Sequence, residues 1–231
     1  MTQFIGARTP AAFVPYASRQ QIVCAGDSLT VGNQSVSTGG YKEWLLRSIG
    51  SSLYAGAYYP NVIGADYANS YSYANIGASG ITSNKLLNNY VIPEIATIPS
   101  ITMPVAPDVV FLLIGTNDFL SGVAKATWLA NYDAIINAFV AANANCHVFA
   151  GNLIDRSGYT STVTDWNASL ASQLAARGDY GTTTGHVHPV DLYTGIGAYS
   201  GTNYADLTHL NANGYKNLMA PTWFNAYDLI F

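Results

Sequence analysis

The sequence predicts one α/β domain built on a doubly wound, mostly parallel β-sheet, and three observations lead to that fold class. Short apolar runs typical of strands alternate five times with stretches whose apolar residues recur at helical spacing. The run from Val109 to Ile114 is apolar at every position, as a strand buried on both faces of a parallel sheet requires. The 231 residues, 49% of them apolar, are enough for one large core. We therefore expect a single domain over residues 1–231, with an extended lead-in over residues 1–20.

The individual elements follow from the same patterns. Strands are expected near residues 21–26, 61–64, 109–114, 146–150 and 186–192. Helices are expected near residues 41–49, 82–91, 124–143 and 163–177, and from residue 211 onward. The four prolines within residues 92–107 predict a connector, and Pro221 predicts a bend in the last helix. The stretch with Tyr67, Tyr71 and Tyr73 is expected either as surface turns or as an aromatic wall beside a site.

Charge and hydropathy exclude two classes of partner. Nine basic and 13 acidic side chains give a formal charge of −4, and no cluster of Lys or Arg marks a nucleic-acid surface. No apolar run approaches the ~20 residues that a membrane-spanning helix needs. The N-terminus lacks the pattern of a signal peptide. The low charge and the many Tyr, Asn and Ser residues are typical of extracellular or virion-exposed surfaces. The sequence does not indicate an oligomeric state.

The cysteines and three of the histidines indicate structural roles. Cys24 and Cys146 fall in predicted strands that are not neighbours, so we expect buried free thiols rather than a disulfide. His186 and His188 share one face of a predicted strand, but no Cys or carboxylate lies at a convincing ligand spacing. His147 is expected to be a packed or edge residue. No metal and no cofactor are predicted.

Ser28 is the candidate nucleophile. It follows an apolar run in the sequence Gly26-Asp27-Ser28-Leu29, so its hydroxyl lies at the carboxyl end of the first strand, where α/β sheets carry their sites. A serine needs a base to take its proton. His209 is the candidate base, and Asp206, three residues earlier, is the candidate acceptor that fixes the imidazole ring.

Acyl transfer also needs hydrogen-bond donors for the oxyanion that forms. The main-chain N–H groups of Ser28 and Gly80 and the side-chain amide of Asn117 are the candidates, and Gly80 has no Cβ to keep a substrate away. Asp27 is expected to bond to loop N–H groups, and Asp118 to cap the segment that follows it. An α/β-hydrolase is excluded, because its serine lies in a mid-chain Gly-x-Ser-x-Gly sequence.

Four blocks of this sequence resemble those of the SGNH hydrolases, also called the GDSL esterase and lipase superfamily. In chain order they are Gly26 to Leu29, Asn75 to Gly80, Gly115 to Asp118, and Asp206 to His209. The resemblance extends from Asp27 to Gly214. It implies a three-layer α/β/α, flavodoxin-like fold with a five-stranded parallel sheet. It also implies ester hydrolysis without a metal, with Ser28, Gly80, Asn117 and His209 as the four residues that give the family its name.

The substrate is indicated by weaker likenesses. The segments Gly40 to Leu45, Asn61 to Gly64 and Ile114 to Asp118 resemble the acetylxylan-esterase-like branch, which removes acetyl groups from sugars. Aromatic rings suit stacking on sugars, and no long apolar lid typical of a lipase is visible. The sequence thus favours a short-acyl esterase that deacetylates carbohydrates. The alternatives are a broad-specificity arylesterase or lysophospholipase-type enzyme and, from another class, a non-catalytic carbohydrate-binding or viral-adhesin module.

Overall fold

A single sheet organises the computed structural model, which describes residues 20–35, 40–53, 64–65, 71–98, 106–181 and 185–231. Its order is β2-β3-β1-β4-β5-β6. The parallel strands are β3 (Tyr71–Asn75), β1 (Gln20–Gly26), β4 (Val109–Leu113), β5 (His147–Gly151) and β6 (Val187–Val190). In chain order these five run 2-1-3-4-5, the flavodoxin-like arrangement, so the predicted fold class is confirmed. The two-residue strand β2 (Gly64–Ala65) adds to β3 in the antiparallel direction.

The position predicted for the second parallel strand was wrong. That strand is β3, whereas residues 61–63 lie outside the described part and Gly64 belongs to the short edge strand β2. β3 pairs along its whole length with β1, with Ala74 beside Val23, and on its other side β2 is its one partner among the described residues. A strand near the sheet edge needs fewer apolar residues than a central one, and its sequence therefore lacks the run of branched side chains that marks β4. Two of the three tyrosines expected in turns or a wall, Tyr71 and Tyr73, lie in this strand.

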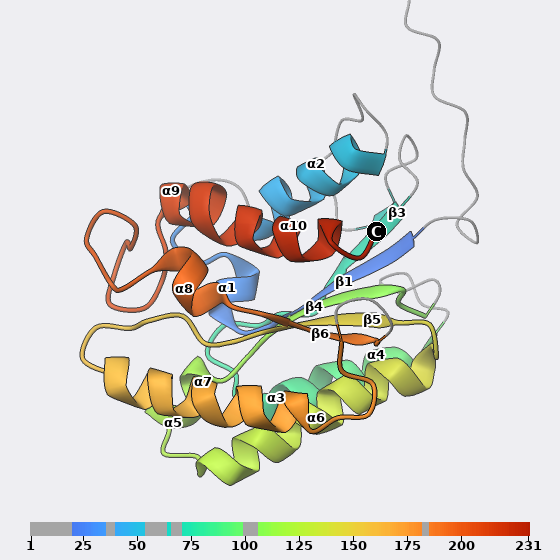
Figure 1. Ribbon diagram of the computed structural model, residues 1–231, viewed down its shortest axis with the longest axis horizontal. Coiled ribbons are helices and arrows are strands. Elements are labelled where there is room, and N and C mark those ends of the chain that lie inside the picture. Colours follow the sequence, from blue (N-terminus) through green and yellow to red (C-terminus); the bar gives the residue numbers. More distant parts are fainter. Residues whose placement is uncertain (1–19, 36–39, 54–63, 66–70, 99–105, 182–184) are drawn as a thin grey trace, which may run out of the picture.

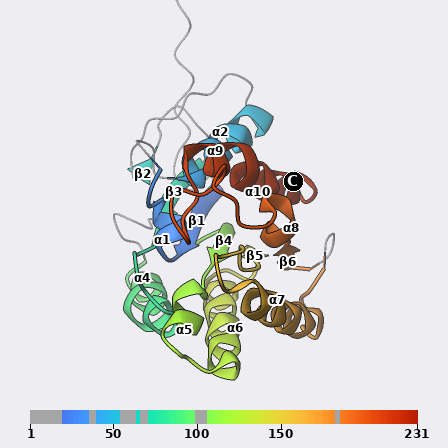
Figure 2. The ribbon, with the colours of Figure 1, turned by 90° about the vertical axis from the view of Figure 1, so that its left-hand side faces the viewer.

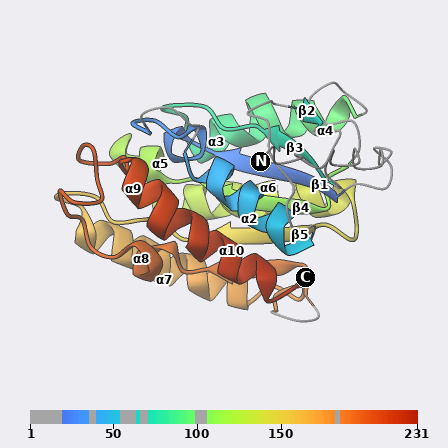
Figure 3. The same ribbon diagram turned by 90° about the horizontal axis from the view of Figure 1, so that it is seen from above.

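Helices cover both faces of the sheet (Figure 1, Figure 2). One face carries α2 (Tyr41–Leu53), α8 (Leu192–Ile196) and the C-terminal segment α9 (Ala212–Gly214), η3 (Tyr215–Met219) and α10 (Ala220–Asp228). The other carries α3 (Ser83–Leu86), η2 (Leu87–Val91), α4 (Ile92–Ala96), α6 (Lys125–Ala142) and α7 (Thr160–Ala175). Two short helices, α1 (Ser28–Val31) and α5 (Thr116–Leu120), directly follow the strand ends that carry the predicted site. Seen from above, α2 and α10 lie side by side (Figure 3).

Two prolines lie just after π-helical turns. Pro221 is in the first turn of α10 and follows η3, and Pro93 is in the first turn of α4 and follows η2. Proline has no N–H to donate to the preceding turn, and a locally wider turn accommodates that missing hydrogen bond. The helix expected to end at residue 91 therefore continues through Pro93 to Ala96, where a connector was predicted.

Each face of the sheet has its own hydrophobic core. Trp128, Tyr132 and Phe139 of α6 are fully buried on one face, and Trp223 and Tyr227 of α10 on the other. Cys24 and Cys146 belong to opposite cores, and both are buried free thiols, as predicted. Across the described ranges, no helix has the length and apolar content to span a bilayer.

Candidate active site

The nucleophile candidate is held at the end of β1 by a tight turn. Gly26 ends the strand, and a Cβ there would lie 2.1 Å from the carbonyl oxygen of Leu113, so no larger residue fits. Asp27 is the N-cap of α1, and its Oδ1 accepts a hydrogen bond from the N–H of Leu29 at 3.0 Å. Ser28 is the first residue of α1 and is 7% exposed. The strand end and the cap together direct a nearly buried hydroxyl toward the carboxyl edge of the sheet.

His209 connects Ser28 to Asp206. Its Nε2 lies 2.8 Å from the Oγ of Ser28, and its Nδ1 lies 2.8 Å from Oδ2 of Asp206. These two contacts have the geometry that general-base activation of a serine requires. Residues separated by 181 positions in the chain meet here, and the three side chains predicted from sequence lie together.

The carboxylate of Asp206 is fixed by further donors. Its Oδ1 accepts hydrogen bonds from the N–H groups of Thr208 at 2.8 Å and His209 at 2.7 Å. Partial burial raises the pKa of Asp206. Hydrogen bonds from the main chain and ring of His209 and from the N–H of Thr208 lower it more, so the pKa lies below its ordinary value. Asp206 therefore stays ionised beside the imidazole of His209.

The loop that carries Asp206 and His209 is braced from both sides. Within it, the N–H of Ala205 donates to the carbonyl of His209 at 2.9 Å, next to a β-bridge between Tyr204 and Leu210. From the loop after β5, Nε of Arg156 donates to Oγ1 of Thr208 at 2.7 Å. The imidazole is thus positioned by its own loop and by a neighbouring one.

Besides the N–H of Ser28, two oxyanion-donor candidates, Gly80 and Asn117, come from the segments that follow β3 and β4. The loop after β3 is tied to the nucleophile strand, because the N–H of Ala78 donates to the carbonyl of Gly26 at 3.1 Å. Gly80 has φ +74°, and a Cβ there would meet nothing within 4 Å. The left-handed backbone conformation, and not crowding by neighbouring atoms, therefore explains why this residue is glycine. Nδ2 of Asn117 donates to the carbonyl of Ile81 at 3.0 Å. An amide nitrogen carries two hydrogens, which leaves one for a second acceptor.

Asp118 anchors the Gly80 loop, and the role predicted for it was wrong. It does not cap the segment that follows it. Its two oxygens accept from the N–H of Ser83 at 2.9 Å and from the hydroxyl of Ser83 at 2.6 Å, at the start of α3. Asp118 is fully buried, and burial raises its pKa while the Ser83 donors lower it, with a net increase. The carboxylate thereby joins the segment of Asn117 to the segment of Gly80.

The sequence analysis missed Lys42. Its side chain on α2 is 5% exposed, and its Nζ donates to the carbonyl oxygens of Thr30 and Val31, the latter at 2.8 Å. These are the last two residues of α1, the helix that begins with Ser28. Burial lowers the pKa of Lys42 to about 8. Nothing in the sequence marks this lysine, because a lone Lys at the start of a helix ordinarily faces solvent.

Asp27 is buried beside Ser28, the candidate nucleophile. It has no exposed surface, and burial raises its pKa to about 7, with the charge of Asp118 adding to the increase and the N–H of Leu29 opposing it. Its Oδ2 has no hydrogen-bond partner within the described residues. The bond to Leu29 is the kind of loop contact predicted for this side chain.

The other three histidines gather at the amino ends of β5 and β6, away from Ser28. Nδ1 of His147 lies 2.8 Å from Nε2 of His188, and the two rings stack with centroids 5.1 Å apart. His186 precedes β6 instead of lying within it, and its ring is 5.2 Å from that of His147. In the described part of the chain, no three His, Cys, Asp or Glu side chains are placed to hold a metal ion.

Solved structures of the same fold include carbohydrate esterases, lipases and other esterases. A carbohydrate esterase family 3 protein from Talaromyces cellulolyticus is 19% identical, with TM-score 0.67, over 90% of this chain and 96% of its own. A family 3 carbohydrate esterase from Clostridium thermocellum is 23% identical, with TM-score 0.63, over 90% and 94%. A psychrotrophic esterase from Pseudoalteromonas sp., inhibited by monoethylphosphonate, is 16% identical, with TM-score 0.63, over 90% and 97%. At these identities the likeness establishes the fold.

The family follows from the sequence itself. Residues 24–216 match the GDSL-like lipase/acylhydrolase family, and the chain belongs to it. This is a family of carboxylic ester hydrolases, as the resemblance of the four blocks implied. No curated protein sequence matches the chain.

Proposed function

We propose that this hydrolase removes short acyl groups, acetyl above all, from carbohydrates by a serine mechanism. Ser28 is the nucleophile, His209 the general base and Asp206 its partner. The observation that carries the proposal is the pair of 2.8 Å contacts that links the three side chains through the two nitrogens of one imidazole.

The mechanism has two stages. The Oγ of Ser28 attacks the ester carbonyl carbon while Nε2 of His209 takes the hydroxyl proton. The main-chain N–H groups of Ser28 and Gly80 and the amide of Asn117 donate to the oxyanion. The intermediate then expels the alcohol, which takes the proton from His209 and leaves an acyl-serine. Water, deprotonated by His209, attacks the acyl-serine by the same route, releases the acid and restores the hydroxyl.

The choice of substrate has two kinds of support. Carbohydrate esterases are among the proteins with this fold, and so is an acetyl esterase whose structure contains acetate. Lipases share the fold as well, and a broad-specificity arylesterase or lysophospholipase-type activity is therefore the second candidate. The two candidates differ in the length of acyl chain that they accept.

Hydrolysis of p-nitrophenyl acetate by purified variants tests the roles of Ser28 and His209. We expect Ser28→Ala and His209→Ala each to lower kcat by roughly 10⁴–10⁶, because the first variant lacks the nucleophile and the second lacks the base that activates it. His186→Ala, which removes an imidazole at the far end of the sheet, is the matched control and should keep wild-type turnover. Near-wild-type turnover in Ser28→Ala would refute the assignment. A folded wild-type protein without turnover would favour a binding module.

Acyl length then separates the two esterase candidates. With p-nitrophenyl esters from acetate to decanoate, a deacetylase should lose most of its kcat/KM beyond short chains. A profile that rises toward decanoate would instead favour the lipase-like candidate.

A further inference from the structure

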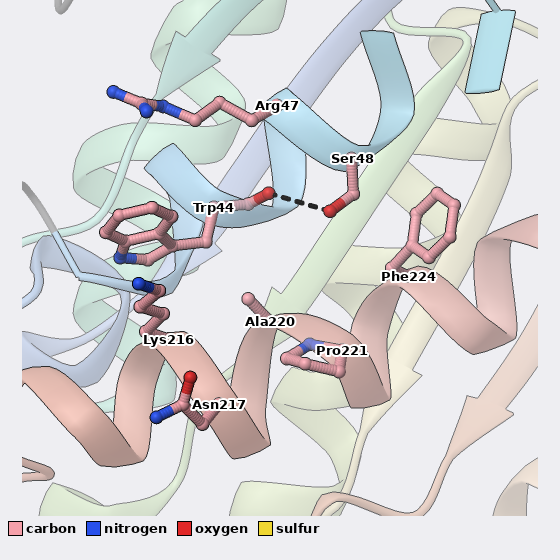
Figure 4. A pocket seen from close by; sticks show the side chains of 8 residues that line it. All are labelled: Trp44, Arg47, Ser48, Lys216, Asn217, Ala220, Pro221 and Phe224. Atoms are coloured by element: carbon pink, nitrogen blue, oxygen red, sulfur yellow. Dashed lines mark hydrogen bonds between the residues drawn. The ribbon is translucent and has the colours of Figure 1, made fainter. Parts of the chain in front are cut away.

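A groove lies between α2 and the C-terminal helical segment, outside the catalytic contacts described above. Trp44, Arg47, Lys216, Asn217, Pro221 and Phe224 are among the residues that line it (Figure 4). Its volume of about 640 Å³ is in the range of small-molecule sites, ~300–1,000 Å³. The groove is open to solvent along its length, as a site for part of a longer chain would be.

The charge in the groove is one-sided. Its two ionisable lining residues, Arg47 and Lys216, are both cations, in a chain whose formal charge is −4. Arg47 is paired with Glu43 at 2.6 Å, and that carboxylate is only 8% exposed. Lys216 forms no ion pair with any residue that the structure describes. An anion in the groove would therefore meet the unneutralised charge of Lys216.

Aromatic contacts hold the two cations at one end. The Nζ of Lys216 lies 4.5 Å from the ring centroid of Trp44, and the guanidinium carbon of Arg47 lies 5.1 Å from it. Figure 4 shows Arg47 and Lys216 on either side of the indole, with Pro221 and Phe224 farther along the groove. The groove thus presents positive charge at one end and a flat apolar surface at the other.

The charged end lies next to the segment that carries the nucleophile. Tyr215, which precedes Lys216, donates its hydroxyl hydrogen to the carbonyl of Asn33 at 3.0 Å, in the loop after α1. Lys42, two residues before Trp44, donates to the last carbonyls of α1. The helical segments that line the groove therefore also support the segment that begins with Ser28.

We propose that this groove binds an acidic sugar, a uronic acid residue, of the carbohydrate chain that carries the ester. The carboxylate meets Lys216 and the exposed side of Arg47, the apolar face of the ring packs on Pro221 and Phe224, and Asn217 bonds to ring hydroxyls. The proposal rests on the carbohydrate substrate proposed above and narrows it to acidic, esterified polysaccharides.

Tryptophan fluorescence of the Ser28→Ala protein provides the test, because this protein cannot turn over a substrate. Trp44 is partly exposed, whereas Trp128, Trp166 and Trp223 are buried, so a saturable fluorescence change reports on the groove. We expect trigalacturonate to bind at least tenfold more tightly than the neutral xylotriose. Adding Lys216→Gln should weaken trigalacturonate binding by about tenfold, and high salt should do the same. Lys125→Gln, which removes an exposed lysine on α6, is the matched control and should bind like its parent.

Three results would overturn the proposal. They are equal binding of trigalacturonate and xylotriose, an unchanged affinity in the Lys216→Gln protein, and stronger binding of 3-phenylpropionate, an apolar anion that is not a sugar. Turnover of p-nitrophenyl acetate by the wild-type enzyme is measured in parallel. A loss of sugar binding with intact, Ser28-dependent turnover contradicts the groove alone, and an absence of turnover contradicts the proposed function.

Discussion

At the scale of single residues, the imidazole of His209 is the centre of the proposed chemistry. Both ring nitrogens have a partner at 2.8 Å, one a hydroxyl and the other a carboxylate. The carboxylate is kept ionised by N–H donors that lower the pKa of Asp206. A proton taken from Ser28 therefore creates a cation next to a fixed anion, which lowers the energy of the charged intermediate state.

Asn117 offers a test of the oxyanion donors that leaves the nucleophile and base in place. Asn117→Ala should lower kcat for p-nitrophenyl acetate by about 10²–10³, with little change in KM, because the amide acts on charge that develops in the transition state. Asn131→Ala is the control, since this amide donates to Ser83 in the supporting network. A wild-type kcat in Asn117→Ala would remove this residue from the proposed oxyanion hole.

Residues with a chemical signature were predictable from the sequence, and residues defined by their surroundings were not. The convergence of Ser28, Asp206 and His209 could be predicted, because a serine, an acid and a histidine are residue types that a serine mechanism requires. The contacts of Lys42 with α1 could not be predicted, because they depend on the burial of its side chain in the folded protein. Asp118 was recognised, but its partner Ser83 lies 35 positions away, and local sequence gave no sign of that contact.

At the level of helices and strands, the short helix α1 depends on contacts with other segments for its stability. A helix of four residues has too few internal hydrogen bonds to be stable alone. Its N-terminus is capped by Asp27, and its last carbonyls accept hydrogen bonds from Lys42 of α2. A lysine from another helix thus supports the helix that begins with Ser28.

Replacing Lys42 tests this dependence. Lys42→Met keeps an apolar stem of similar length but leaves two buried carbonyl oxygens without this donor. We expect kcat for p-nitrophenyl acetate to fall about tenfold, equivalent to ~1.4 kcal/mol in the barrier, because the serine is held less firmly. Lys125→Met on α6 should have no such effect. An unchanged kcat in a folded Lys42→Met protein would show that α1 does not need the lysine.

Elements with strong periodicity were predicted well, and those shaped by tertiary contacts were not. The helix expected near 124–143 is observed as Lys125–Ala142, because one face of it is consistently apolar. The second parallel strand was misplaced, because β3 is polar and is specified by pairing with β1. The π-helical turns before Pro93 and Pro221 were not predicted either, because they form where the helix accommodates a proline that has no N–H to donate.

At the scale of the whole molecule, the site and the histidine cluster lie at opposite ends of the strands. Ser28 follows the carboxyl end of β1, whereas His147 and His188 lie at the amino ends of β5 and β6. The fold class was predictable, because alternating strands and helices allow few topologies. The groove was not predictable, because it joins α2 to a helical segment some 170 positions later.

The buried imidazole of His188, which stacks on that of His147, predicts how stability responds to acid. Burial, together with the neighbouring His147 and His186, lowers the pKa of His188 from 6.5 to about 4, although the nearby main chain of Gly181 opposes this. Between these values the unfolded chain binds the proton and the folded chain does not, so the free energy of unfolding falls as the pH falls from about 6.5 to about 4.

Urea unfolding of wild type and His188→Leu between pH 7 and pH 4 measures this contribution. The wild-type protein should lose up to about 3 kcal/mol more than the variant over the range, because its imidazole must remain neutral in the core. If the free energy of unfolding fell equally with pH in the two proteins, His188 would not make the expected contribution.

The central claim is that Ser28 is the nucleophile of an enzyme assembled from the ends of several strands. Labelling with a serine-directed organophosphonate, followed by peptide mass spectrometry, tests it most directly. We expect one phosphonyl group per chain, on the peptide that contains Ser28, and loss of esterase activity in proportion to labelling. An active preparation that stays unlabelled, or that carries the label on a different serine, would contradict it.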